Sequence, residues 1–198
     1  MQSSRALWTD RLGGLIGSQP KFNPKLAARR KPQADPISAF RGVVLGIDPS
    51  VRGTGLAVLE CHGNTFQYLA SSTLAIPPKV HFLGCLGIIH REIVALLNQY
   101  PIGRVGVEET IFVQNFRTMQ LLGCARGAAL GPISAAGIEI IQMSPKTIKQ
   151  SVTISGSADK ALVQRMVASI LGRGVLPPDE ADAAAAAIAA SMGRNASP

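Results

Sequence analysis

Four carboxylates could act together in this sequence: Asp48, Glu108, Asp179 and Asp182. Asp48 ends the apolar run 43–47, and Glu108 ends the β-rich run 104–107. Asp179 and Asp182 are three residues apart, so on a helix they face the same side. An ionised carboxylate beside a buried strand is costly unless it is paired or bound to a cation. Each acid also has an ordinary structural explanation, because acids cap turn amides and first helical turns.

Carboxylates that converge from separate elements repel one another strongly unless cations neutralise them. Hard oxygen ligands of this kind suit Mg²⁺ or Mn²⁺. Two such ions about 4 Å apart commonly serve in-line displacement at a phosphodiester. We therefore expect two Mg²⁺ ions, with Mn²⁺ able to substitute, if the folded chain brings these acids together.

The elements that must position the acids predict an α/β fold. The runs 43–47 and 56–59, joined by a Pro/Gly-rich turn, predict a hairpin, and residues 65–73 add a third antiparallel strand. Two further strands, 104–107 and 138–141, alternate with helices, which places functional groups at the carboxyl ends of adjacent strands. Two longer helices are expected at 79–99 and at about 114–136. A short helix is expected to begin at the Ser144-Pro145 cap, and the next to follow a cap at Gly156-Ser157 and end at about 171. The last helix is expected from Pro177 to about 191.

Composition limits the class of protein. A chain of 198 residues suggests one domain, expected at 42–194, and no apolar run reaches the roughly 18 residues of a membrane span. Cys61, Cys85 and Cys124 support neither a disulfide framework nor a zinc site, which fits a reducing cytoplasm. Residues 1–41 hold eight basic and two acidic residues, which predicts a disordered basic extension that contacts a polyanion or only solubilises the chain.

Lysines and glycines outside the acid cluster also carry signals. Lys160 near a helix start opposes the helix dipole, which suggests a ligand, although exposed lysines usually only meet solvent. Gly123, Gly127 and Gly131 leave one face of the 114–136 helix bare. From the residues alone, that face packs on the sheet or, less often, on the same helix of a second subunit.

The region from Gly42 to about Arg194 resembles the RuvC family of Holliday-junction resolvases, in the RNase H-like superfamily. The matching segments, in order, are Gly46-Ile47-Asp48-Pro49 with Thr54-Gly55; Val107-Glu108-Glu109 with Asn115; Leu122-Gly123-Cys124-Ala125-Arg126-Gly127; Ile148-Lys149-Gln150 with Gly156-Ser157-Ala158-Asp159-Lys160 and Val163-Gln164-Arg165-Met166-Val167; and Asp179-Glu180-Ala181-Asp182-Ala183.

The resemblance implies an RNase H-like mixed five-stranded sheet, three strands antiparallel and the others parallel, flanked by helices. It implies a four-acid metal site at Asp48, Glu108, Asp179 and Asp182, and lysines Lys149 and Lys160 that hold phosphates. It places the glycine face in a homodimer interface, reversing the preference indicated by the residues alone. The implied activity is Mg²⁺-dependent, symmetric nicking of four-way DNA junctions in recombination and repair, together with the RuvA and RuvB proteins. The further expected DNA contacts are Lys146, Arg126, Asn115 and Phe112, the last as the aromatic that stacks on a junction base, although strict alignment places Ile111 there.

One departure and three alternatives accompany this interpretation. Ser50 stands where the family usually has glycine, so the turn after Asp48 is expected to differ slightly. A related RNase H-like nuclease of the YqgF type would act on RNA instead. An actin-like ATPase or sugar kinase would need a duplicated second half and a longer chain. A junction-binding protein without catalysis would gain nothing from acids that repel DNA phosphates.

Overall fold

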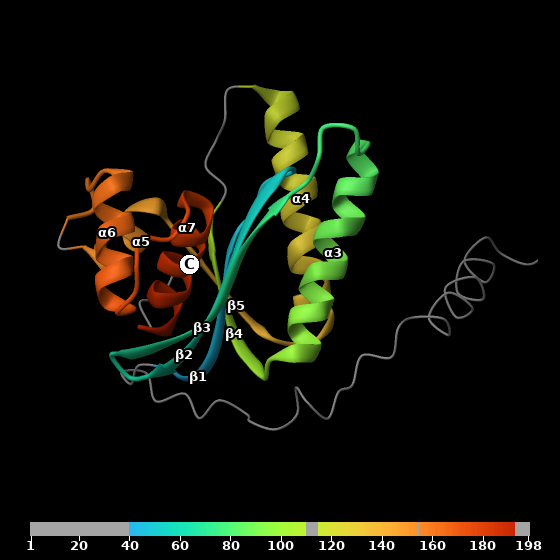
Figure 1. The fold of residues 1–198 in the computed structure, drawn as a ribbon. Helices are drawn as coiled ribbons and strands as arrows, with labels where there is room; N and C mark the ends of the chain where they lie inside the picture. Colours follow the sequence, from blue (N-terminus) through green and yellow to red (C-terminus); the bar gives the residue numbers. More distant parts are fainter. Residues whose placement is uncertain (1–39, 110–114, 154, 193–198) are drawn as a thin grey trace, which may run out of the picture.

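A single five-stranded sheet lies at the centre of the molecule, with helices on both faces (Figure 1). This computed structural model describes residues 40–109, 115–153 and 155–192. The strands are β1 (Arg41–Asp48), β2 (Gly53–His62), β3 (Thr65–Ala75), β4 (Ile102–Glu108) and β5 (Glu139–Met143). Their order across the sheet is β3-β2-β1-β4-β5. The first three strands are antiparallel, whereas β4 pairs parallel with β1 and β5 pairs parallel with β4, so the predicted mixed sheet is confirmed.

Helices α3 (Phe82–Gln99) and α4 (Phe116–Ala135) cover one face of the sheet. Branched side chains of β1, β2 and β4 pack there against Ile89 and Ile93 of α3 and Ala129 of α4. α3 begins three residues later than the sequence indicated, because His81 rather than the Pro77-Pro78 pair forms its N-cap. The side chain of His81 accepts a hydrogen bond from the Gly84 amide, a cap that the proline signal concealed.

Helices α5 (Pro145–Val152), α6 (Lys160–Ile170) and α7 (Pro178–Ser191) cover the other face. The predicted Ser144 cap of α5 is confirmed, since its side chain accepts from the Thr147 amide at 3.1 Å. The prediction that Gly156-Ser157 caps α6 is wrong. Asp159 caps that helix by accepting from the Leu162 amide at 2.7 Å, which also fixes Lys160 as the first helical residue.

α7 lies directly on the backbone of the sheet. Gly46 of β1 pairs with Ala57 of β2 on one side and with Gly106 of β4 on the other, which gives a row of small residues across three strands. A Cβ atom at Gly46 would lie 1.8 Å from the carbonyl oxygen of Ala183, and one at Gly106 would lie 2.2 Å from that of Ala186. The helix therefore sits closer to the sheet than any side chain at these two positions would allow.

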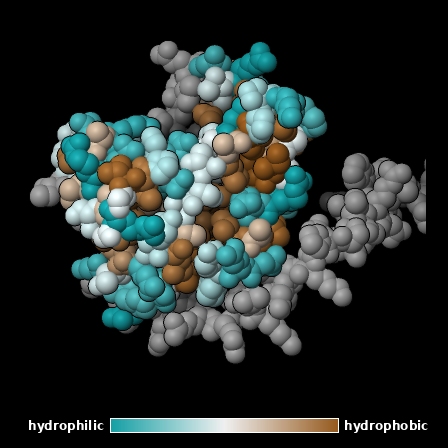
Figure 2. Space-filling view, viewed as in Figure 1, coloured by the Kyte–Doolittle hydropathy of each residue, from teal (hydrophilic) through white to brown (hydrophobic). Residues whose placement is uncertain are grey.

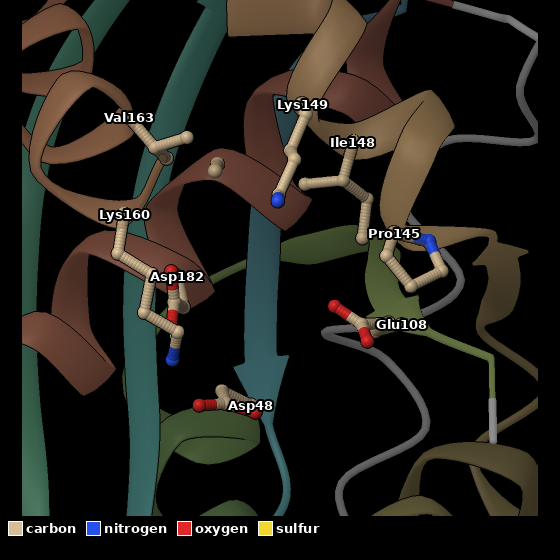
Figure 3. Close-up of a pocket in the computed structure, with 9 residues that line it drawn as sticks. Asp48, Glu108, Pro145, Ile148, Lys149, Lys160, Val163 and Asp182 are labelled. Atoms are coloured by element: carbon tan, nitrogen blue, oxygen red, sulfur yellow. The ribbon is translucent and has the colours of Figure 1, made fainter. Parts of the chain in front are cut away.

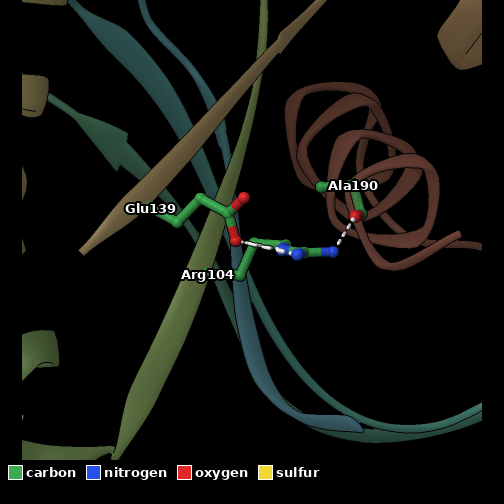
Figure 4. A network of polar contacts seen from close by, with 3 residues as sticks. All are labelled: Arg104, Glu139 and Ala190. Atoms are coloured by element: carbon green, nitrogen blue, oxygen red, sulfur yellow. Dashed lines mark hydrogen bonds and ion pairs between the residues drawn. The ribbon is translucent and has the colours of Figure 1, made fainter. Parts of the chain in front are cut away.

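The end of α7 is fastened by Arg104 (Figure 4). Its guanidinium bonds Glu139 of β5, with an Nη2 to Oε2 distance of 2.8 Å, and donates to the carbonyl oxygen of Ala190 at 3.1 Å. The same group lies over the ring of Phe40, and the Phe40 amide donates to the Ser191 carbonyl. These contacts join β4, β5, α7 and the residue before β1 at the end of the sheet opposite to Asp48. The boundary of the domain at 42–194 stays a prediction, and residues 1–39 lie outside the described part of the chain.

None of the helices in the described ranges is long and apolar enough to cross a membrane.

The close docking of α7 predicts that Gly46→Ala destabilises the fold. The added methyl group has to displace helix backbone, so we expect a loss of at least about 3 kcal/mol in the free energy of unfolding. Gly87→Ala in α3 is the matched control, since its Cβ would meet only the flexible end of Arg91 at 3.3 Å. That control should be neutral or stabilising by up to about 1 kcal/mol. Chemical denaturation followed by circular dichroism measures both, and equal stabilities would contradict the docking argument.

Candidate active site

The parallel strands bring the first two acids together. Ile47 pairs with Val107 in the register of β1 and β4, so Asp48 and Glu108 leave the sheet side by side at its carboxyl edge. β5 ends at the same edge and leads through Ser144 into α5, which carries Lys149. The parallel register explains why acids 60 positions apart in sequence become neighbours.

α7 adds the remaining acids. Its docking on the glycine row places Asp182 beside Asp48, and both line a pocket of about 340 Å³ with Glu108, Lys149 and Lys160 (Figure 3). Asp179 is not among the residues that line this pocket. It lies one turn earlier, where its backbone covers Gly55 and its Oδ2 would be 3.2 Å from a Cβ at Gly53.

Burial and mutual repulsion make Asp48 the most strained acid. Its pKa rises to about 6, first because the carboxylate is buried and then because Asp182, Asp179 and Glu108 are close. The pKa of Glu108 is also raised, mainly by the partial burial of its carboxylate and then by Asp182. Lys160 opposes both shifts, and its Nζ donates to Asp182 Oδ2 at 3.3 Å. The site therefore concentrates negative charge that nearby lysines partly neutralise, and Lys160 acts on both Asp48 and Glu108.

The side chains of this pocket fit a divalent cation by their chemistry. Three carboxylates act on a fourth, Asp48, and hard oxygen donors are the ligands that Mg²⁺ and Mn²⁺ prefer. Within the ranges that the structure describes, no three His, Cys, Asp or Glu side chains are grouped tightly enough to hold a metal ion. The paired strands and the docked helix set the backbone positions of these acids.

The turn after Asp48 tolerates Ser50. The Ser50 side chain accepts from the Gly53 amide at 3.0 Å, and the Thr54 hydroxyl donates to the Ser50 carbonyl at 2.5 Å. No residue other than glycine has a positive φ in the described chain, so this turn does not need the freedom of glycine at position 50. Arg52 also donates to the carbonyl groups of Pro77 and Val80, which ties the turn to the start of α3.

The other expected DNA contacts do not line the pocket or lie outside the described residues. Lys146 is exposed outside it, next to Gly156. Asn115 caps α4 by accepting from the Thr118 amide at 3.1 Å. Phe112 lies outside the described residues, as does Ile111. Their roles in DNA binding stay predictions.

Sequence reasoning missed two positioning features. The Arg126 guanidinium donates to the carbonyl oxygen of Glu108 and to Gln142 Oε1, which holds the ends of β4 and β5 against α4. The second feature is the glycine row under α7. Glycine inside a strand signals close backbone approach, so Gly46 and Gly106 could have revealed it.

Known proteins share this arrangement of strands and helices. The family model described as crossover junction endodeoxyribonuclease RuvC matches residues 44–190. This chain belongs to the RuvC family. Relatives named crossover junction endodeoxyribonuclease RuvC include those of Ruminiclostridium cellulolyticum, 35% identical over 74% of this chain and 89% of the relative, and of Hyphomonas neptunium, 38% identical over 75% and 89%.

Solved RuvC structures have the same fold. Thermus thermophilus RuvC superposes with a TM-score of 0.69 at 30% identity, over 76% of this chain and 93% of the other. The T. thermophilus RuvC in complex with Holliday junction substrate gives a TM-score of 0.69 at 28% identity, over 77% and 94%. The expected RNase H-like fold is thereby confirmed for the matched region.

The strained carboxylate predicts a pH-dependent gain of stability in Asp48→Asn. A folded-state pKa of about 6 lies above the ordinary value of 3.8, so in the metal-free protein the ionised Asp48 opposes folding above pH 6. Well below the ordinary value the acid is protonated in both states and this cost vanishes. We expect the substitution to raise the free energy of unfolding at pH 7 by on the order of 2 kcal/mol, and by much less at about pH 4. Urea denaturation in EDTA at both pH values measures it, and a pH-independent difference would contradict the electrostatic origin of the gain.

Proposed function

We propose that this chain is a structure-specific endonuclease that resolves four-way DNA junctions by paired hydrolysis of phosphodiesters. The observation that carries the proposal is the pocket in which Asp48, Glu108 and Asp182 meet Lys149 and Lys160. Acids alone would repel a phosphate, whereas acids beside lysines can hold a cation and a phosphate together. Membership of the RuvC family and the likeness to a RuvC bound to Holliday junction substrate support DNA junctions as the substrate.

We further propose that the four acids bind two Mg²⁺ ions, for which Mn²⁺ can substitute. Bound there, such ions would supply positive charge to the attacking water and to the leaving oxygen. Asp48, held at the end of β1, is the ligand best placed to be shared, because Glu108, Asp179 and Asp182 all act on it. Lys149 extends from α5 into the pocket and makes no ion pair within the described residues, so its ammonium is free for a phosphate oxygen.

The basic extension has a proposed role as well. Its charge and the position of Phe40, at the end of the sheet opposite to Asp48, would allow it to contact phosphates at a distance from the cut. We also propose that the protein works in the reducing cytoplasm, which fits its three free cysteines, and acts there with RuvA and RuvB.

A homodimer is proposed because α4 offers an open face. A Cβ atom at Gly123, Gly127 or Gly131 would meet nothing within 4 Å, although Ala125 and Ala129 on the opposite face are buried. α4 has only two charged residues in 20, Arg117 and Arg126. Figure 2 shows hydrophobic residues at the surface on the side where α3 and α4 lie. An exposed helix with this composition suits contact with a second copy, which paired cuts also require.

The carboxylate site predicts that Asp48→Asn and Glu108→Gln abolish cleavage while junction binding persists. Loss of one ligand should lower the rate in Mg²⁺ by at least about 100-fold, because the remaining acids cannot place the ions. Glu109→Gln is the matched control, since Glu109 neighbours Glu108 in sequence but does not line the pocket. The assay compares a synthetic four-way junction, duplex DNA and structured RNA. Preferential cleavage of RNA would favour the YqgF type, and cleavage by Asp48→Asn at the wild-type rate would refute the site.

The dimer proposal predicts that Gly127→Leu produces a folded monomer. The leucine meets open space within the described chain, so the fold should persist while a second copy is excluded. Ala161→Leu, at an exposed position of α6, adds bulk elsewhere. Sedimentation gives the mass, and circular dichroism confirms folding. A dimer of unchanged affinity in Gly127→Leu would exclude the α4 face as the interface.

A further inference from the structure

Lys160 occupies a distinctive position among the cations of the pocket. Its Nζ lies 3.3 Å from Asp182 Oδ2, and Figure 3 shows its side chain reaching from α6 past Asp182 toward Asp48. Lys149 enters the same pocket from α5 but forms no ion pair in the described chain. The two lysines therefore carry the same charge into one pocket, but only Lys160 is paired with a carboxylate there.

The charges around Lys160 come from every acid of the site. Asp182, Asp48 and Asp179 all act on its ammonium group, which in turn acts on Glu108. Lys149 also acts on Glu108. A positive charge that interacts with all four carboxylates lies near the centre that a metal ion would take.

The ion pair between Lys160 and Asp182 can open, because the lysine side chain is far more exposed to solvent than the aspartate. The Lys160 side chain is 80% exposed, whereas that of Asp182 is 29% exposed. The backbone at Lys160 is held by the Asp159 cap, so the lysine can swing into solvent without disturbing α6 or the pocket wall. The acid stays in place while its partner is free to leave.

We propose that Lys160 is a displaceable cation of the metal-free site: its ammonium neutralises the acids until divalent ions replace it. Displacement frees the same ammonium for a phosphate oxygen of the DNA, so metal entry and the grip on DNA are coupled through one side chain. The inference rests on the proposed metal site.

Calorimetric titration of Mn²⁺ into the DNA-free protein tests it. Lys160→Met and Lys149→Met remove the same charge from the same pocket, but only the first removes an ammonium group that is ion-paired with a carboxylate of the site. We expect Lys160→Met to bind Mn²⁺ about five- to tenfold more tightly than wild type, and Lys149→Met to gain no more than about twofold. Equal gains in the two variants, or weaker binding by Lys160→Met, would overturn the proposal.

Thermal unfolding gives a second readout without activity. In EDTA, Lys160→Met should melt about 2–4 °C below Lys149→Met, because its acids repel one another without a counter-charge. Saturating Mn²⁺ should remove that difference, and a difference that persists would indicate a purely structural lysine.

The variant Asp48→Asn distinguishes a failure of the proposed metal site from a failure of the proposed role of Lys160. Mn²⁺ binding that Asp48→Asn leaves unchanged would refute the metal site itself, whereas binding lost in Asp48→Asn but equal in the two lysine variants refutes only the role of Lys160.

Discussion

The contact between the backbone of α7 and the backbone of the sheet is the constraint on which the site depends. Gly46 and Gly106 let the carbonyl groups of Ala183 and Ala186 approach the strands where any side chain would collide. The alanines of α7 fill the remaining space and are buried almost completely. Because the helix cannot move away from or slide along this row without losing the fit, Asp182 is held beside Asp48 with little freedom.

A site built in this way stores electrostatic repulsion in the fold. The carboxyl edge of the parallel strands delivers Asp48 and Glu108 together. Burial raises the pKa of both acids, and the negative charge of Asp182 on α7 raises it further. Neighbouring groups relieve part of this cost. The first turn of α7 has amides without a side-chain cap, which favour the negative charge of Asp179, and Lys160 compensates Asp182 directly. The balance suits a protein that is completed by cations and by a phosphate backbone.

The two faces of the sheet have different roles in the structure. The face covered by α5, α6 and α7 builds the pocket, and its far end is closed by Arg104 with Glu139 and the Ala190 carbonyl. The face covered by α3 and α4 forms a core of branched aliphatic side chains. α4 also connects the faces, because Arg126 reaches the end of β4 at Glu108.

The sequence alone predicted the strands, most of the helices and the four acids that we propose as metal ligands. Alternation of apolar and polar residues, turn residues and proline caps are local signals. A carboxylate at the end of an apolar strand can likewise be recognised from the sequence without knowing the fold. The sequence placed the starts of α3 and α6 a few residues before their true caps, His81 and Asp159. Several adjacent residues could serve as caps there, and only tertiary packing selects one. The register of β1 with β4, the glycine row under α7 and the pairing of Lys160 with Asp182 were decided by tertiary structure. Each depends on contacts between segments far apart in the chain, where the closeness of approach, rather than residue type, determines which groups meet.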